Sequence, residues 1–436
     1  MKIGNIKTIL TKGRASMNLG KIINYHRKKQ HMTQEQLCHG ICSASHLSKI
    51  ENDTKEANIE TLKLLCNRLG ISIDDEEEKI KRIKEQLQRF YNGMERLHNK
   101  QVESLFNELS KYKEYVKFTD LLYLYDLYLL RYYLYVHQYQ KVEEQVEKIK
   151  INKKKFTQYE AFVWNVVNAI YYHRKNDFSK ALELLNEVKD LRKRYRDQIT
   201  EYYYLKAIMH SKLSQSALAI YYGNKAFEIY KQSNNTIRLL DTKTILSIHL
   251  IRTGEYASAE KLLMEILNEA ESIQNNTIIE TALHNLGFLY GSQNCSEKAL
   301  DYYYQSLAMI EKNTDGYYLT LGNIVEHLLK LHKNQQVIET LAQELESFED
   351  KTKLEYIKLQ IFYLEAQNNE EEVIQFLISH GLPIMEKTNN RMKVYEFSER
   401  IAKYFQRQGN AILANEYLQI SFHNYKIIHS NKGVIK

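Results

Sequence analysis

The chain has 436 residues and a formal net charge of +7, from 61 Lys and Arg against 54 Asp and Glu. One proline and 15 glycines are too few for a β-rich or loop-rich protein, because closely spaced strands need turn residues between them. We therefore expect an all-α protein. No run of about 18 apolar residues is present, and the N-terminus lacks the apolar run of a secretory signal. We expect a cytoplasmic protein without a membrane partner.

The positive charge is concentrated at the N-terminal end. Residues 1–72 hold 12 Lys and Arg against 5 Asp and Glu, so the remaining 364 residues are neutral. A polyanion such as DNA is bound by clustered cations rather than by a small positive charge spread over the whole chain. Any nucleic-acid partner should therefore bind this end. Residues 1–16 form a basic N-terminal extension, which is either a flexible arm or sequence upstream of the true start codon.

Residues 32–52, MTQEQLCHGICSASHLSKIEN, are predicted to form two short helices joined by a turn. Thr33 followed by Gln36 has the order of a capping box, and Ser43 is placed to cap a second helix that ends near Glu51. The first turn of that second helix carries no large apolar side chain. A helix that serves only packing rarely begins in this way, so we expect this turn to face a partner.

Flanking helices complete a module over residues 17–72, which resembles the Xre/Cro-type helix-turn-helix family. The resemblance is carried by Leu19-Gly20, Arg27, Thr33-Gln34, Leu37, Ile41, Ser45, Leu47 to Asn52, Leu62, Leu65 and Leu69 to Ile71. It implies that the helix from Ser43 to Glu51 enters the major groove of double-stranded DNA. The alternative is a helix-turn-helix kept only for packing or dimerisation.

The same resemblance implies individual DNA contacts. Base edges would be met by Ala44, Ser45, Ser48 and Lys49, with His46 at the margin. Phosphates would be met by Thr33, Gln34 and Ser43.

The four cysteines, Cys38, Cys42, Cys66 and Cys295, are too few for a disulfide framework in a chain of this length. They are expected to be small core residues. A zinc or redox role is the alternative, but no CxxC pair accompanies them. We predict no metal and no cofactor.

Residues 73–95 are predicted to form a helical connector. Five acidic residues at its start suit the N-terminus of a helix, and basic residues continue it. Hinge action of this helix is a hypothesis.

Residues 96–430 are internally repetitive. A small or β-branched residue recurs every 36 to 41 residues, at Val102, Val142, Ala181, Ala219, Ala259, Ala299, Val337, Val373 and Ala414. This period predicts a solenoid of about nine helical hairpins.

The hairpins resemble tetratricopeptide repeats. The pattern of a small residue, a tyrosine and a second small residue appears at Gly287, Tyr290 and Ala299, and at Ala169, Tyr172 and Ala181. The resemblance implies a right-handed superhelix whose inner groove binds peptides.

Two asparagines are candidate peptide contacts. Asn285 and Asn323 lie 38 residues apart, one repeat, at equivalent positions. Each can offer a donor and an acceptor to an extended ligand, and Asn is otherwise a poor choice in mid-helix. The alternative is that both are simply solvated. Arg131, Asn165 and Asn168 are further candidates, and Arg131 could hold a ligand carboxylate.

A helix-turn-helix followed by about nine tetratricopeptide repeats resembles the RNPP family of peptide-sensing quorum regulators, especially its NprR branch. The resemblance implies a transcription regulator, active as a homodimer or higher homo-oligomer on a palindromic operator. A short signalling peptide would gate it.

Two other functions remain open. The chain could be a Rap-like protein that also binds a phosphorelay response regulator and promotes its dephosphorylation, or its repeats could bind a different protein partner. No Gly-rich phosphate loop, HExxH or GxSxG motif appears, so we predict no catalytic residues and no enzyme. His284 is expected to be a groove or packing residue.

Overall fold

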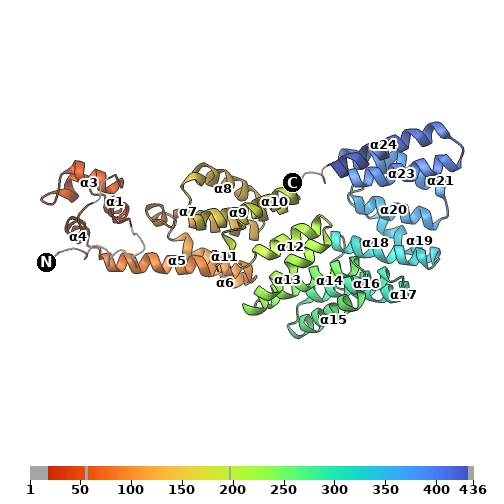
Figure 1. The fold of residues 1–436 in the computed structure, drawn as a ribbon, viewed down its shortest axis with the longest axis horizontal. Coiled ribbons are helices and arrows are strands. Elements are labelled where there is room, and N and C mark those ends of the chain that lie inside the picture. The colour runs from red at the N-terminus through yellow and green to blue at the C-terminus, as the bar shows by residue number, and fades with distance from the viewer. Residues whose placement is uncertain (1–17, 55–56, 196–197, 431–436) are drawn as a thin grey trace. The chain divides into compact units, whose positions relative to one another are not determined.

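The computed structural model describes residues 18–54, 57–195 and 198–430, which contain helices and no strand (Figure 1). The chain divides into two compact units, residues 1–249 and residues 250–436, with the boundary inside α14 (Thr236–Arg252). The all-α prediction is confirmed for these ranges. The extension predicted at residues 1–16 lies outside them. Within the same ranges, no helix is both long enough and apolar enough to cross a membrane.

The first unit begins with a four-helix module. Its helices are α1 (Leu19–Lys29), α2 (Gln34–Cys38), α3 (Ala44–Glu51) and α4 (Ile59–Arg68). Thr33 and Gln36 form the predicted capping box at the start of α2, and the Ser43 hydroxyl accepts from the backbone N–H of His46 at the start of α3. Both cap predictions are therefore confirmed.

The module has its own apolar core. It is built from Ile23, Leu37, Cys38, Leu47, Ile50, Leu65, Cys66 and Leu69. Cys38 and Cys66 are thus packing residues, and burial raises the pKa of the Cys66 thiol to about 11. All four cysteines are free thiols.

The rest of the first unit consists of paired helices. They are α5 (Ile73–Glu95), α6 (Asn99–Ser110), η1 (Tyr115–Phe118), α7 (Leu122–Tyr135), α8 (Tyr139–Asn152), η2 (Lys153–Lys155), α9 (Gln158–Arg174), α10 (Phe178–Glu187), α11 (Arg192–Tyr195), α12 (Tyr202–Lys212) and α13 (Ser216–Gln232). Successive helices pack in pairs, α5 on α6, α7 on α8, α9 on α10 and α12 on α13. The predicted connector is thus a single helix, α5, which also forms the first hairpin.

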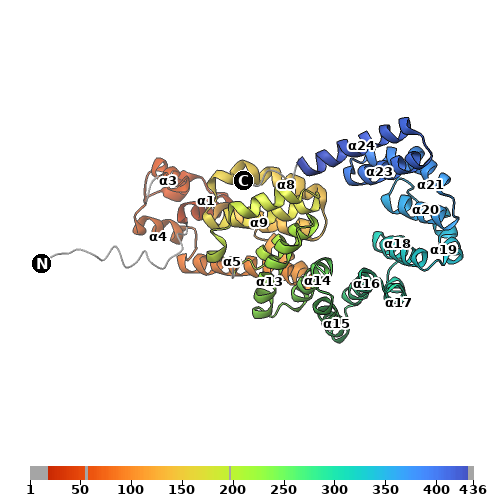
Figure 2. The ribbon, with the colours of Figure 1, turned by 45° about the vertical axis from the view of Figure 1, so that its right-hand side comes forward.

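The second unit continues the same arrangement. Its helices are α15 (Tyr256–Ser272), α16 (Asn276–Ser292), α17 (Ser296–Leu307), α18 (Asp315–Lys330), α19 (Asn334–Glu346), α20 (Leu354–Ala366), α21 (Glu370–Phe376), η3 (Leu377–Gly381), α22 (Leu382–Lys387), α23 (Arg391–Arg407) and α24 (Ala411–Ser430). Figures 1 and 2 both show α23 beside α24, and these helices are in extensive contact.

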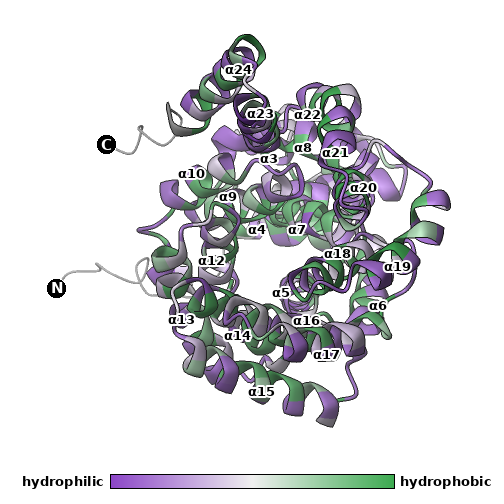
Figure 3. Cartoon of the chain, turned by 90° about the vertical axis from the view of Figure 1, so that its right-hand side faces the viewer, coloured by the Kyte–Doolittle hydropathy of each residue, from purple (hydrophilic) through white to green (hydrophobic). Residues whose placement is uncertain are grey.

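Burial of the repeat anchors confirms the helical repeat. Each of the nine small or β-branched residues predicted from the period lies on a different helix, and none is more than 5% exposed. Small side chains are needed because helices cross closely. A Cβ on Gly287 would lie 2.6 Å from the ring of Tyr303 on α17. Figure 3 shows hydrophobic and hydrophilic residues alternating along most helices, as expected when one stripe packs inward.

Asparagine replaces glycine at many of the hairpin turns. Asn176, Asn234, Asn294 and Asn368 each follow a helix with φ between 50° and 60°. Asparagine tolerates this left-handed conformation better than other residues with a Cβ. A chain with few glycines can therefore still end its helices sharply.

Candidate functional site

The residues predicted to contact DNA lie together on one surface of the N-terminal module. Thr33, Ser43, Ser45 and Lys49 are exposed, and Gln34, Ala44, His46 and Ser48 are partly exposed. They come from α3, from its cap and from the start of α2. None of the eight is buried, so this surface can reach a partner.

A buried carboxylate holds this surface in place from beneath. The Arg27 guanidinium on α1 donates from Nε to Oε1 of Glu51 at 2.6 Å and from Nη2 to Oε2 at 2.7 Å. Gln34 donates to the same carboxylate at 2.8 Å. Because Glu51 is only 3% exposed, this clamp fixes α1, α2 and α3 against one another. The amide N–H₂ of Gln34 is thereby used within the protein.

A close helix crossing also positions α3. A Cβ on Gly20 of α1 would lie 2.0 Å from the carbonyl oxygen of Ile50. Only glycine allows this approach. The predicted motif residue Gly20 therefore sets the distance between α1 and α3.

A second carboxylate attaches the module to the repeat helices of the same unit. Glu76 on α5 lies 3.1 Å from Nε2 of His26 on α1, and it accepts a hydrogen bond from the hydroxyl of Tyr115 on η1. The Lys79 ammonium lies 3.6 Å from Glu76 and 3.6 Å from the centroid of the Tyr115 ring. Burial raises the pKa of Glu76, but these partners outweigh burial and hold that pKa below its usual value. The carboxylate is therefore ionised at neutral pH.

Aromatic rings complete this junction. The Tyr25 ring on α1 lies 5.1 Å from the ring of Tyr115 and 5.5 Å from the ring of Phe118. The first contact is edge-to-face, the arrangement that aromatic pairs favour. The segment η1 thus packs against α1 of the N-terminal module.

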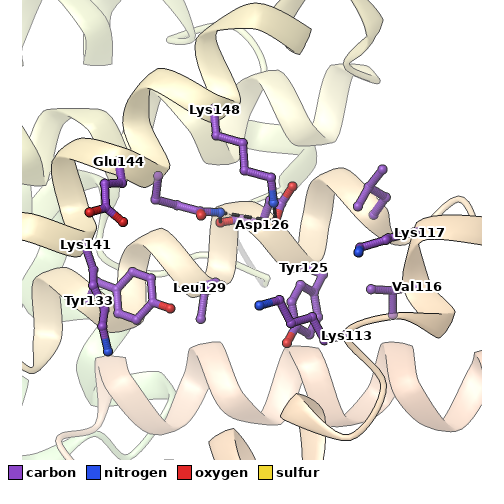
Figure 4. Close-up of a pocket in the computed structure, with 12 residues that line it drawn as sticks. Lys113, Val116, Lys117, Tyr125, Asp126, Leu129, Tyr133, Lys141, Glu144 and Lys148 are labelled. Carbon is purple, nitrogen blue, oxygen red and sulfur yellow. Dashed lines mark hydrogen bonds and ion pairs between the residues drawn. The ribbon is translucent and has the colours of Figure 1, made fainter.

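A pocket of about 340 Å³ lies on the other side of η1, between that segment, α7 and α8 (Figure 4). Lys113, Lys117, Lys141 and Lys148 line it, together with the two acids Asp126 and Glu144. Lys148 Nζ lies 2.6 Å from Asp126 Oδ1, and this ion pair neutralises the buried carboxylate. The pocket walls are therefore basic overall.

Arg131, a predicted peptide contact, lies in a buried polar centre of the first unit. We call this the Glu201 centre, formed by Tyr91, Glu95, Arg131 and Glu201. Arg131 donates to Glu201 from Nε at 3.3 Å and from Nη2 at 3.2 Å, and Tyr91 donates to the same carboxylate. Burial and then the neighbouring charge of Glu201 raise the pKa of Glu95 to about 8. To hold a ligand carboxylate, Arg131 would have to leave Glu201.

The asparagines of α9 are also buried. Asn165 donates to the carbonyl oxygen of Leu184 and to the Glu187 carboxylate, each at 3.0 Å. In the described part of the chain, Asn168 Oδ1 has no hydrogen-bond partner. That oxygen is itself shielded from solvent, so a ligand could reach it only if the surrounding side chains moved.

In the second unit, a hydrogen bond links the helices that carry the other two predicted peptide contacts. His284 Nδ1 on α16 lies 2.8 Å from Thr320 Oγ1 on α18, and burial lowers the pKa of His284 to about 4. The imidazole is therefore neutral at pH 7, and its hydrogen bond with Thr320 joins α16 to α18. Asn285 donates to the carbonyl oxygen of Thr281, and Asn323 is partly exposed.

Comparisons with known proteins agree with this arrangement. Residues 23–75 match the helix-turn-helix family model. The transcriptional activator NprA of Geobacillus stearothermophilus is 22% identical over 401 residues, which cover 88% of this chain and 97% of that protein. The apo form of the quorum sensor NprR from B. thuringiensis has a TM-score of 0.69 at 19% identity, over 79% of this chain and 99% of that one. The chain therefore shares its fold with NprR, and its helix-turn-helix match lies ahead of the repeat helices. The structure of NprR in complex with its cognate peptide NprX has a TM-score of 0.61 at 19% identity, over 78% of this chain and 97% of that one.

The helix-turn-helix pattern includes Arg27 and Glu51, but it does not indicate that they form a clamp beneath α3. It gives no sign of the contact between Glu76 and Tyr115. The run of acidic residues at the start of α5 was the available signal for Glu76. Its partner Tyr115 lies 39 residues away, so no local pattern could pair them.

Proposed function

We propose that this chain is a DNA-binding transcription regulator whose activity is set by a short signalling peptide bound to its repeat helices. The observation that carries the proposal is the surface around α3. Its polar side chains are open to solvent, whereas Arg27 and Glu51 beneath it are committed to holding it rigid. A rigid helix with free polar side chains suits reading of base edges. The similarity to the transcriptional activator NprA supports the proposal.

The peptide part of the proposal rests on the repeat helices. The solved structure of NprR with its cognate peptide supports a peptide as the ligand. We propose that Asn285 and Asn323 contact the peptide backbone. In Asn285 the amide N–H₂ already donates to Thr281, so its carbonyl oxygen is the group that would accept a peptide N–H. Binding to a palindromic operator would require a homodimer or higher homo-oligomer.

Replacing Lys49 tests the DNA interface. Genomic fragments selected by the full-length protein supply the DNA, and fluorescence anisotropy measures affinity. We expect Lys49→Ala to weaken binding by about 10- to 100-fold and to relax sequence preference, because a base-edge contact is lost. Lys63→Ala removes the same charge from an exposed position on α4, away from α3. If both variants lose affinity equally for all sequences, α3 is not the reading helix.

Replacing Asn285 tests the peptide interface. The probes are synthetic peptides from the C-terminal end of any small product encoded immediately downstream of this gene. We expect Asn285→Ala to abolish the effect of the active peptide on DNA binding while leaving binding without peptide unchanged. Asn276→Ala is the matched control, an exposed asparagine at the start of the same helix. A normal peptide response in Asn285→Ala would show that the peptide lies elsewhere.

A further inference from the structure

A cluster of cations lies on α11, α12 and α13 of the first unit. It consists of Arg192, Lys193, Lys206 and Lys225, which we call the basic cluster. None of these residues belongs to the predicted DNA or peptide contacts. Three of them line an open cavity of about 720 Å³ together with Tyr203, Tyr221 and one carboxylate, Glu228. The cluster therefore has space beside it for a ligand.

Two cations of the basic cluster lie over tyrosine rings. The Arg192 guanidinium carbon lies 5.3 Å from the centroid of the Tyr203 ring, and Lys225 Nζ lies 4.0 Å from that of Tyr221. Tyr221 is half exposed, and its hydroxyl accepts a hydrogen bond from the Lys225 ammonium. Cation–π contacts hold the charges in place without neutralising them.

Glu228 lines the same cavity, but it forms no ion pair with the cluster within the part of the chain that the structure describes. Among the residues that the structure describes, none of its four members forms an ion pair with an acid. Lys206 is only 5% exposed, and its ammonium bonds the neutral side chains of Asn186 at 2.7 Å and Tyr222 at 3.2 Å. Burial, followed by the positive charges of Arg192, Lys189 and Lys225, lowers the pKa of Lys206 to about 8. The basic cluster therefore keeps an excess of positive charge, although its members repel one another.

One donor of the cluster is buried and unused. In the described part of the chain, Nε of Arg192 is shielded from solvent and has no hydrogen-bond partner. A buried donor without an acceptor is costly, more so on a charged group, and such groups call for an explanation. A shift of the Arg192 side chain toward an oxyanion in the adjoining cavity would give this donor an acceptor.

We propose that the basic cluster is a binding site for a phosphate group, distinct from the proposed DNA and peptide sites. A phosphate dianion matches the site better than a carboxylate does. It carries up to two negative charges and three acceptor oxygens, while the site offers several cations and a guanidinium fork. The half-exposed Tyr221 offers an aromatic ring on which a base could stack, so the phosphate could belong to a free ion or to a nucleotide monophosphate.

Isothermal titration of the full-length chain tests the site. The probes are sodium phosphate, adenosine monophosphate and sodium acetate, at constant ionic strength. We expect both phosphates to bind more tightly than acetate, and Arg192→Gln to weaken their binding by about tenfold or more, because a charge-assisted hydrogen bond is lost. Arg194→Gln is the matched control, since Arg194 lies on the same short helix, is exposed and bonds Gln158 instead. This control should bind phosphate within about twofold of the unmodified chain.

Two comparisons complete the test. Tighter binding of adenosine monophosphate than of phosphate, lost in Tyr221→Ala, identifies a nucleotide site, and equal binding identifies a site for the free ion. Circular dichroism and thermal melting establish that the variants are folded, and Arg192→Lys, which keeps the charge but not the fork, should bind with intermediate affinity. The proposal is overturned if neither phosphate binds, if acetate binds as tightly, or if Arg192→Gln, shown to be folded, binds like the unmodified chain.

Discussion

In the N-terminal module, Arg27 and Glu51 lie beneath a row of polar side chains that stay open to solvent, whereas in the Glu201 centre the polar groups are turned toward one another. Both regions contain a bidentate contact between an arginine and a buried glutamate. They differ in what surrounds the pair. Around α3, exposed side chains remain available to a partner, whereas Arg131 is buried and donates to Glu201 from Nε and Nη2. The type of a residue therefore predicts its function poorly until the hydrogen bonds that the residue makes are known.

The largest expected effect comes from breaking the Glu201 centre. We expect Arg131→Met to lower the free energy of unfolding by about 3–5 kcal/mol, because Glu201 is left as a buried unpaired charge. Lys150→Met, which breaks an ion pair with Glu147 in which both side chains are exposed, should cost no more than about 1 kcal/mol. Urea unfolding of the full chain measures both. Unchanged stability in Arg131→Met, together with a lost peptide response, would make Arg131 a ligand residue.

A smaller effect should follow from disturbing the crossing of α1 and α3. Gly20→Ala places a methyl group against the carbonyl oxygen of Ile50, so we expect a loss of about 1–3 kcal/mol and weaker DNA binding. Gly40→Ala is the control, since its Cβ would meet nothing within 4 Å and only the left-handed φ of 70° is strained. That variant should keep its DNA affinity. Equal DNA binding by both variants would argue against the crossing as the determinant of α3.

The smallest expected effect concerns pH. The pKa of Glu95 is raised from about 4.5 to about 8, so the folded chain keeps a proton that the unfolded chain loses. The contribution of the Glu95 carboxyl to the free energy of unfolding is fully present below about pH 4.5. It declines as the pH rises from there to about 8. Glu95→Gln keeps the acceptor for the N–H groups of Thr200 and Glu201 and removes the ionisation.

Thermal melts at pH 6 and pH 9 measure this difference. Relative to the unmodified chain, Glu95→Gln should gain about 2–4 °C in Tm at the higher pH, the shift that corresponds to about 1 kcal/mol in a domain of this size. Glu103→Gln, an exposed glutamate on α6, should show no such gain. A gain of the same size in Glu103→Gln would point to a general charge effect.

Local signals explain which parts of the structure could be predicted. The caps at Thr33 and Ser43 and the nine buried anchors follow from spacings of a few residues or from a regular period, and the structure has them as expected. The partners of Arg131 and Glu76 could not be found in this way. Arg131 and Glu201 are 70 residues apart, and only the stacking of hairpins brings them together. The DNA and peptide contacts themselves remain predictions.

The asparagines at the hairpin turns have a consequence for the unfolded chain. A glycine at Asn176 or Asn294 would relieve the strain of the left-handed conformation, but it would also give the denatured polypeptide more conformations to lose on folding. The two contributions oppose each other and are of similar size. Substitution between asparagine and glycine at these positions is therefore close to neutral, and the turns can drift in sequence while the period of the repeats is kept.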